Sequence, residues 1–266
     1  MENKQQIYLN AIGINANDTD ALYELAMTLD IDSNNDQKTI LMPSGESMNK
    51  EQLLLKIIDI NPNHSKAYHK LSVALNDEHS SIILPSGQSM TEKQLLLKSI
   101  ECNPYNFGAY SNLATTLSEG ESITLNNGQS MTQQQLYLKV IECDPTISNP
   151  YYNLAITLSR GESITLNNGQ TMTEKQLFAK AIECGPNIPH LYVNFAETLY
   201  VNETFTLHNG VTMTKQQLLL EANKLDNTQS WVYKDIGLTL LNNKQTITLP
   251  NGEQLTRRQL LQKARE

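Results

Sequence analysis

Residues 121–145 read ESITLNNGQSMTQQQLYLKVIECDP, and residues 162–186 read ESITLNNGQTMTEKQLFAKAIECGP. The block recurs around six glycines spaced by 42, 41, 41, 41 and 42 residues: Gly45, Gly87, Gly128, Gly169, Gly210 and Gly252. A fixed period of this length is the mark of a repeat array. We therefore expect residues 1–266 to form one array of a single unit, with these glycines at hairpin turns.

Each block begins with a β-hairpin pattern, in which residues 123–125 and 129–131 flank Asn126-Asn127-Gly128. A two-residue turn would need the residue before it to pair in the ladder, but proline, which has no N–H, stands there in three copies: Pro43, Pro85 and Pro250. We therefore predict a three-residue loop with the glycine in the left-handed conformation. This register places Ile123 opposite Met131 and leaves one apolar face on each hairpin, which must pack on a helix or on the next hairpin.

A helix start follows each hairpin directly. Threonine or asparagine stands four residues after each turn glycine, and glutamine stands three residues later. This is a capping box, in which each of the two side chains accepts a hydrogen bond from the other residue's backbone N–H. The pairs are Asn49 and Gln52, Thr91 and Gln94, Thr132 and Gln135, Thr173 and Gln176, Thr214 and Gln217, and Thr256 and Gln259. Asn3 and Gln6 repeat the pattern, so we expect the chain to open on the same kind of helix.

Each repeat contains two helices, which we call the first and the second helix. The first helix precedes the hairpin, for example from Ala109 to Leu117, with apolar residues three and four positions apart. The second helix follows the hairpin, for example from Gln133 to Cys143. A proline ends it in four copies, at Pro62, Pro104, Pro145 and Pro186. We expect six first helices, six hairpins and seven second helices, the last from Arg257 to Arg265.

Three positions recur in every first helix. They are a mostly aromatic one (Leu22, Tyr68, Tyr110, Tyr151, Tyr192, Tyr233), a leucine-like one (Leu25, Leu71, Leu113, Leu154, Phe195, Ile236) and a small one (Ala26, Ser72, Ala114, Ala155, Ala196, Gly237). The pattern resembles the tetratricopeptide repeat, a 34-residue helix–turn–helix unit. An inserted hairpin of seven residues accounts for the period of 41. The resemblance implies a mainly α fold, a right-handed α-solenoid of helix pairs with a short β-hairpin inserted in each repeat.

Composition and motifs exclude several functions. The formal net charge of −8 argues against a protein that binds nucleic acid phosphates. No run of eighteen apolar residues is present, so we expect no membrane span. The five histidines share no repeat position, and no HExxH, CxxC or phosphate-binding loop occurs. We therefore expect no enzyme, no metal site and no cofactor.

The three cysteines, Cys102, Cys143 and Cys184, occupy one repeat position. Other copies have Ile14, Ile60 and Leu225 there, which predicts a buried apolar position and a structural role for the cysteines. The methionines Met48, Met90, Met131, Met172 and Met213 also share a position, just before the helix cap, which Leu255 takes in the last copy. We interpret them as core residues.

In tetratricopeptide arrays the first helices line a concave groove that takes peptides or protein segments. The residue before the leucine-like position should then face the groove, and it is asparagine in three successive repeats: Asn112, Asn153 and Asn194. An amide can donate and accept at once, so a ladder of amides can hold an extended backbone. A duplicated solvated position is the alternative interpretation. Further groove candidates are Tyr152, Thr115, Ile156, Glu197, Lys70, Lys234 and Trp231.

The leading functional prediction is a non-catalytic module that holds an extended segment or partner protein in this groove, without nucleic acid or membrane partners. One alternative is a self-assembling structural protein. It would use hairpin edges, aligned into a ribbon or paired with another chain, or uncapped solenoid ends. Weak self-association through those ends would also fit the leading prediction. Another alternative is a regulator or inhibitor of an enzyme that it binds. We expect a cytoplasmic protein, and export into another cell would leave no trace in this sequence.

Overall fold

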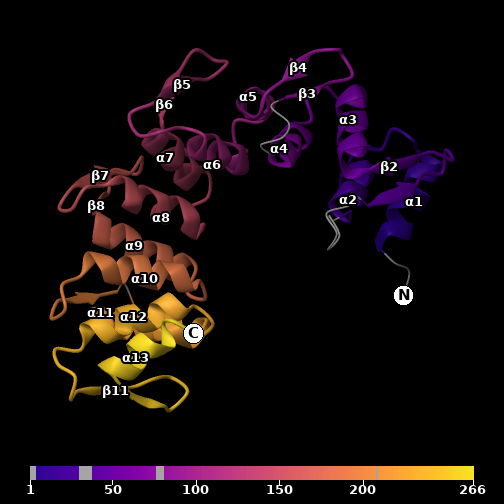
Figure 1. Ribbon diagram of the computed structural model, residues 1–266. Helices are drawn as coiled ribbons and strands as arrows, with labels where there is room; N and C mark the ends of the chain where they lie inside the picture. Colours follow the sequence, from indigo (N-terminus) through magenta and orange to yellow (C-terminus); the bar gives the residue numbers. More distant parts are fainter. Residues whose placement is uncertain (1–3, 30–37, 76–80, 208) are drawn as a thin grey trace. The chain divides into compact units, whose positions relative to one another are not determined.

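The computed structural model describes residues 4–29, 38–75, 81–207 and 209–266, which form thirteen α-helices and twelve β-strands (Figure 1). The second helices are α1 (Lys4–Ile14), α3 (Lys50–Ile60), α5 (Glu92–Cys102), α7 (Gln133–Cys143), α9 (Glu174–Cys184), α11 (Lys215–Leu225) and α13 (Arg257–Lys263). The first helices are α2 (Thr19–Met27), α4 (Ser65–Ala74), α6 (Phe107–Thr115), α8 (Ser148–Thr157), α10 (Pro189–Thr198) and α12 (Ser230–Thr239). The fold is mainly α, as the sequence predicts.

A hairpin lies between the first helix of each repeat and the second helix that follows it. The six hairpins are β1 (Thr39–Leu41) with β2 (Ser47–Asn49), β3 (Ile82–Ile83) with β4 (Ser89–Met90), β5 (Ser122–Thr124) with β6 (Ser130–Thr132), β7 (Ser163–Thr165) with β8 (Thr171–Thr173), β9 (Thr204–Thr206) with β10 (Thr212–Thr214), and β11 (Thr246–Thr248) with β12 (Gln254–Thr256).

The chain divides into two compact units, residues 1–136 and 137–266, with the boundary inside α7. Within the first unit α1 to α6 pack in chain order, each against the next, and within the second unit α8 to α13 do the same (Figure 1). That the repeats run as one array over residues 1–266 stays a prediction, and each unit is described by itself.

The core of each unit consists of the positions that recur in the first helices. Every leucine-like residue is at most 1% exposed, from Leu25 to Ile236. The aromatic residues are also buried, and the hydroxyl groups of four of them (Tyr68, Tyr151, Tyr192 and Tyr233) donate to the backbone carbonyl six residues earlier. The Tyr68 hydroxyl lies 3.1 Å from the Pro62 oxygen, and the Tyr192 hydroxyl lies 2.9 Å from the Pro186 oxygen. This bond gives the six-residue spacing between proline and tyrosine a physical reason, because a buried hydroxyl needs a partner.

The hairpin register is the one predicted. Ile123 pairs with Met131, and the corresponding residues pair in the other five hairpins. Leu125 N–H donates to the Gln129 carbonyl, Gly128 N–H donates to the Leu125 carbonyl, and Gly128 has φ of +86°. The loop therefore has three residues and ends on a left-handed glycine. Met131, Met172 and Met213 are buried, and Met48 and Met90 pack against the core, which confirms the interpretation of the methionines.

All six predicted capping boxes are present. At α7, for example, the Gln135 N–H donates to the Thr132 hydroxyl oxygen at 3.3 Å, and the Thr132 N–H donates to the Gln135 side chain at 2.9 Å. The other five have the same two bonds. The cap predicted at Asn3 lies outside the described residues. Each of the six second helices that follow a hairpin therefore begins with a capping box, which gives hydrogen-bond partners to backbone N–H groups at its start.

Two helix boundaries differ from the predicted ones. The first helix expected over Ala109–Leu117 runs from Phe107 to Thr115, because the Asn106 side chain accepts from the Ala109 N–H and so caps the helix earlier. The last helix ends at Lys263 instead of Arg265. Both predictions relied on apolar periodicity, which does not mark where the capping side chain stands.

The hairpins do not align into a ribbon. Over the described residues each sheet contains only its own two strands. Packed helices lie roughly 8–10 Å apart, whereas paired strands lie about 4.8 Å apart. Hairpins that alternate with pairs of helices are therefore too far apart to share a ladder. The apolar face of a hairpin packs on helices, which is one of the two arrangements expected.

The three cysteines are half-buried, so the prediction of a buried apolar position was wrong. All three cysteines are free and partly exposed, and Ile14 at the same repeat position is 90% exposed. The Cys184 thiol lies 3.7 Å from the Pro145 carbonyl oxygen, which also accepts the Tyr151 hydroxyl at 3.1 Å. Cys102 approaches the Pro62 carbonyl in the same way, at 3.9 Å. At Cys102 and Cys184 the position thus places a weak thiol donor against a carbonyl of the preceding repeat.

Candidate interaction site on the first helices

A pocket of about 370 Å³ opens on the first helices of the second unit. Four of its lining residues are groove residues predicted from the sequence: Tyr152 and Ile156 on α8, and Asn194 and Glu197 on α10. The remaining ones are Arg160, Glu174, Phe178 and Thr198. Residues three or four positions apart lie on one side of a helix. Two successive first helices therefore present adjacent rows to the same space.

Tyr152 lines this pocket and contacts three neighbouring side chains. Its hydroxyl oxygen accepts a hydrogen bond from Asn194 Nδ2 at 2.7 Å. Its ring meets those of Phe178 and His190 edge-on, with centroids 6.0 and 5.1 Å away. Edge-to-face contacts of this kind stabilise aromatic pairs beyond the area that they bury. The tyrosine is thus held from three sides, which makes the pocket wall pre-organised.

Charged side chains stand around the rim. The Arg160 guanidinium lies 4.0 Å from the centre of the Tyr200 ring and donates to the Thr198 carbonyl at 3.0 Å. Glu174 and the exposed Glu197 contribute two carboxylates. The pocket therefore has groups of both signs, with one more negative than positive. Ile156 is 56% exposed and supplies an apolar surface between them.

Sequence analysis missed Arg160, Glu174, Phe178 and Thr198. Arg160 stands in the loop after α8, and Glu174 and Phe178 belong to the second helix α9, so a search restricted to the first helices passes over them. One signal was available for Phe178. It is the only phenylalanine at a repeat position where the other second helices have Tyr8, Leu54, Leu96, Tyr137, Leu219 and Leu261.

In the first unit, His69 and Asn112 occupy the repeat positions that Tyr152 and Asn194 occupy in the second unit. Asn112 Nδ2 donates to His69 Nε2 at 3.2 Å, as Asn194 donates to Tyr152 in the second unit. Burial, with a smaller effect of the charge on Lys70, lowers the pKa of His69 to about 4. A neutral ring can accept at Nε2, which fits the observed bond. The asparagine therefore links successive first helices.

The other predicted groove residues lie on first helices but not in this pocket. Lys70 on α4 is half-buried, and Thr115 on α6 is exposed with its hydroxyl bonded to the Asn112 carbonyl at 2.7 Å. Asn153 on α8 is half-buried. On α12, Lys234 is exposed, while Trp231 is 44% exposed and its indole N–H donates to the Gln229 side chain at 3.1 Å. The pocket thus brings together four of the ten predicted residues.

Neither a metal site nor a membrane span is found in the residues that the structure describes. No three His, Cys, Asp or Glu side chains among them gather in a way that would hold an ion. Every helix among them is too short or too polar to cross a lipid bilayer.

Helix pairs in fixed register, with a hollow on their first helices, define a helical-repeat module for protein–protein interaction. The tetratricopeptide repeat family matches residues 95–135 and 136–176, two adjacent periods of the repeat. Residues 95–176 are therefore two tetratricopeptide repeats, and a β-hairpin lies between the first helix and the second helix of each repeat of the chain. Protein partners are therefore the general class of ligand.

Other comparisons are more distant. No curated protein matches this sequence. Among solved structures, the crystal structure of yeast Tom70 is similar, with 17% sequence identity and a TM-score of 0.48. The alignment covers 98% of this chain and 46% of the Tom70 chain, so this chain spans about half the length of that protein.

Proposed function

We propose that the first-helix face of this protein holds an extended segment of a partner protein, with the pocket around Tyr152 and Asn194 as its best-formed part. The proposal is supported by one observation above the others. Four residues that were assigned to a groove from the repeat pattern lie around one hollow of about 370 Å³. Binding pockets commonly begin at about 300 Å³.

The chemistry of the pocket suits a peptide backbone with an apolar side chain. Asn194 uses Nδ2 to bind Tyr152, and its Oδ1 remains able to accept from a backbone N–H of the partner. Exposed Ile156 offers an apolar contact, and Arg160 and Glu197 can select charges beside it. A partner held mainly through its backbone would be recognised by shape and by few side chains. We therefore propose an adaptor, or a regulator that binds its target enzyme through this face, acting in the cytoplasm where free cysteines persist.

Affinity capture with point variants of the exposed residues tests this proposal. Ile156→Asp and Glu197→Lys change the surface without removing a described hydrogen bond, so both variants should keep the melting temperature of the parent. The control is Leu241→Ser, which alters an exposed apolar residue outside the pocket. We expect partners quantified by mass spectrometry to be lost at least tenfold with the two pocket variants and to be retained with the control. Equal recovery with all three variants would contradict the proposal, and recovery of only the protein itself would favour self-assembly.

A further inference from the structure

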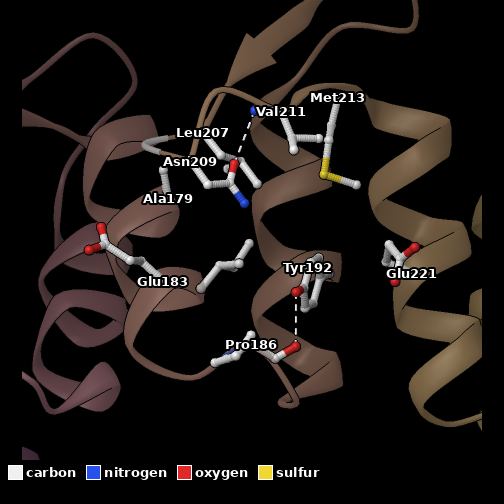
Figure 2. A pocket seen from close by; sticks show the side chains of 10 residues that line it. Ala179, Glu183, Pro186, Tyr192, Leu207, Asn209, Val211, Met213 and Glu221 are labelled. Atoms are coloured by element: carbon white, nitrogen blue, oxygen red, sulfur yellow. Dashed lines mark hydrogen bonds between the residues drawn. The ribbon is translucent and has the colours of Figure 1, made fainter.

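A second pocket, of about 400 Å³, lies between the hairpin β9–β10 and the second helices α9 and α11 (Figure 2). Its wall is mostly apolar and includes Ala179, Ile182, Leu207 and Met213. Tyr192 closes one side, where its hydroxyl donates to the Pro186 carbonyl at 2.9 Å. All these residues belong to the second unit, and none of them belongs to the pocket around Tyr152.

The pocket exists where this repeat departs from the others. Ala179 is 2% exposed and stands where the other complete second helices have Leu9, Leu55, Leu97, Leu138 and Leu220. The smaller side chain leaves unfilled space, as truncation of a buried leucine does. Val211 on the hairpin stands where the other copies have Glu46, Gln88, Gln129, Gln170 and Glu253. At this site a smaller side chain replaces a leucine and an apolar side chain replaces a polar one.

A third difference reverses a charge at the edge of the pocket. Glu221 occupies a position where five other second helices have Lys56, Lys98, Lys139, Lys180 and Lys263, and α1 has Asn10. With Glu183, it places carboxylates at opposite edges of the apolar space (Figure 2). Their intrahelical lysine partners are Lys180 for Glu183, at 3.0 Å, and Lys224 for Glu221, at 3.1 Å. Exposed pairs of this kind are weak, so an incoming cation can compete for each carboxylate.

We propose that this pocket binds a partner segment in which one large apolar side chain is flanked on both sides by lysine or arginine. The apolar side chain fills the space above Ala179, and the flanking cations meet Glu183 and Glu221. A ligand with one cation would satisfy only one of the two carboxylates, which is why a segment with basic residues on both sides fits better than a single small amine. The site shares no lining residue with the pocket around Tyr152, so it is independent of the function proposed for the first-helix face.

The test follows the methyl signal of Met213 in the full chain labelled with ¹³C at the methionine methyls. Met213 lines the pocket, and Met172 is its counterpart on the neighbouring hairpin. The probes are three capped pentapeptides: Gly-Lys-Phe-Lys-Gly, Gly-Glu-Phe-Glu-Gly and Gly-Lys-Ser-Lys-Gly. We expect only the first to shift Met213 in a saturable manner, with a dissociation constant in the millimolar range typical of so small a contact. Equal shifts of Met172 would indicate general attraction to an acidic protein and would overturn the proposal.

Two variants that restore the residues of the other repeats sharpen the test. Ala179→Leu fills the space and should weaken binding of the basic phenylalanine peptide at least tenfold. Glu221→Lys leaves the apolar floor intact and should weaken it roughly fivefold, with little remaining preference over the acidic peptide. Glu119→Lys makes the same charge change at an exposed residue that lines neither pocket, and it should leave this affinity unchanged. Unaltered affinity in both Ala179→Leu and Glu221→Lys would refute the site, and if one variant does not fold the other decides.

Discussion

Nε2 of His69 on α4 accepts a hydrogen bond from Nδ2 of Asn112 on the next first helix, α6, at 3.2 Å. The bond requires a neutral imidazole, and the pKa of His69 is accordingly lowered to about 4, mainly because the ring is buried. The linkage between the two helices is therefore sensitive to acid, which has a measurable consequence for stability.

We expect the free energy of unfolding to fall as the pH decreases from about 6.5 to 4. The folded state lowers the pKa of His69, so its stabilising effect is complete above the unfolded pKa and is lost as the pH falls toward the folded one. The half-buried ring is partly solvated, so the loss should be about 1–2 kcal/mol, less than the whole pKa difference implies. Urea unfolding of the parent and of His69→Ser, which introduces the residue found at Ser111, measures it. Identical pH dependence in both proteins would show that His69 is not responsible.

Gly108 is expected to resist replacement by alanine because of the same histidine. A Cβ at position 108 would lie 2.5 Å from Cε1 of His69. Alanine favours a helix over glycine by about 1 kcal/mol, but the clash should reverse this and cost about 1–3 kcal/mol overall. Thermal unfolding of Gly108→Ala tests the sign. The double variant with His69→Ser removes the obstacle and should be at least as stable as His69→Ser alone, whereas additive effects would exclude the clash.

The Tyr151 hydroxyl should contribute to stability below pH 10 and lose its effect above it. Burial, followed by the nearby Cys184, Glu183 and Asp144, raises the pKa of Tyr151 to about 12. The folded pKa is the higher one, so stability is lost as the pH rises from 10 toward 12, by about 1 kcal/mol at pH 11. Tyr151→Phe removes this dependence and, at pH 7, costs about 1 kcal/mol for the bond to the Pro145 carbonyl. Parallel curves for the two proteins between pH 9 and 11 would contradict the assignment.

Removal of one capping side chain should destabilise the second helix that it starts. Thr173 accepts from the Gln176 N–H at the start of α9, and Thr173→Ala should lower the free energy of unfolding by about 1 kcal/mol. Thr173→Asn retains an acceptor, and asparagine fills this role at Asn49, so it serves as the matched control. A loss in the asparagine variant as large as in the alanine variant would place the effect in the strand instead of the cap.

Local chemistry made most of the fold predictable. The turn glycines, the prolines beside them and the capping pairs each act within a few residues, so hairpin register and second-helix starts agree with the structure. The start of α6 differs because Asn106 was not considered as a cap. The cysteine position differs because its partner, a backbone carbonyl of the preceding repeat, is remote in sequence.

The candidate sites were less predictable because they depend on packing between helices. Tyr152 and Asn194 were each predicted to face the groove, but their mutual hydrogen bond joins different repeats and has no local signal. Arg160 enters the site from a loop. The pocket beneath β9–β10 depends on the small side chain of Ala179 at a position where other second helices have leucine. This difference is visible only when the same position is compared across the repeats.

Thr132 is both the last residue of β6 and the cap of α7, so no linker separates hairpin from helix. The spacing reflects this: from each cap to the next leucine-like residue there are always 22 positions, as from Thr132 to Leu154. All variation in repeat length falls in the loop between the first helix and the hairpin. That loop is consequently the natural place to graft an epitope or a fluorescent reporter, since added residues there leave the strand ladder, the cap and the helix pair undisturbed.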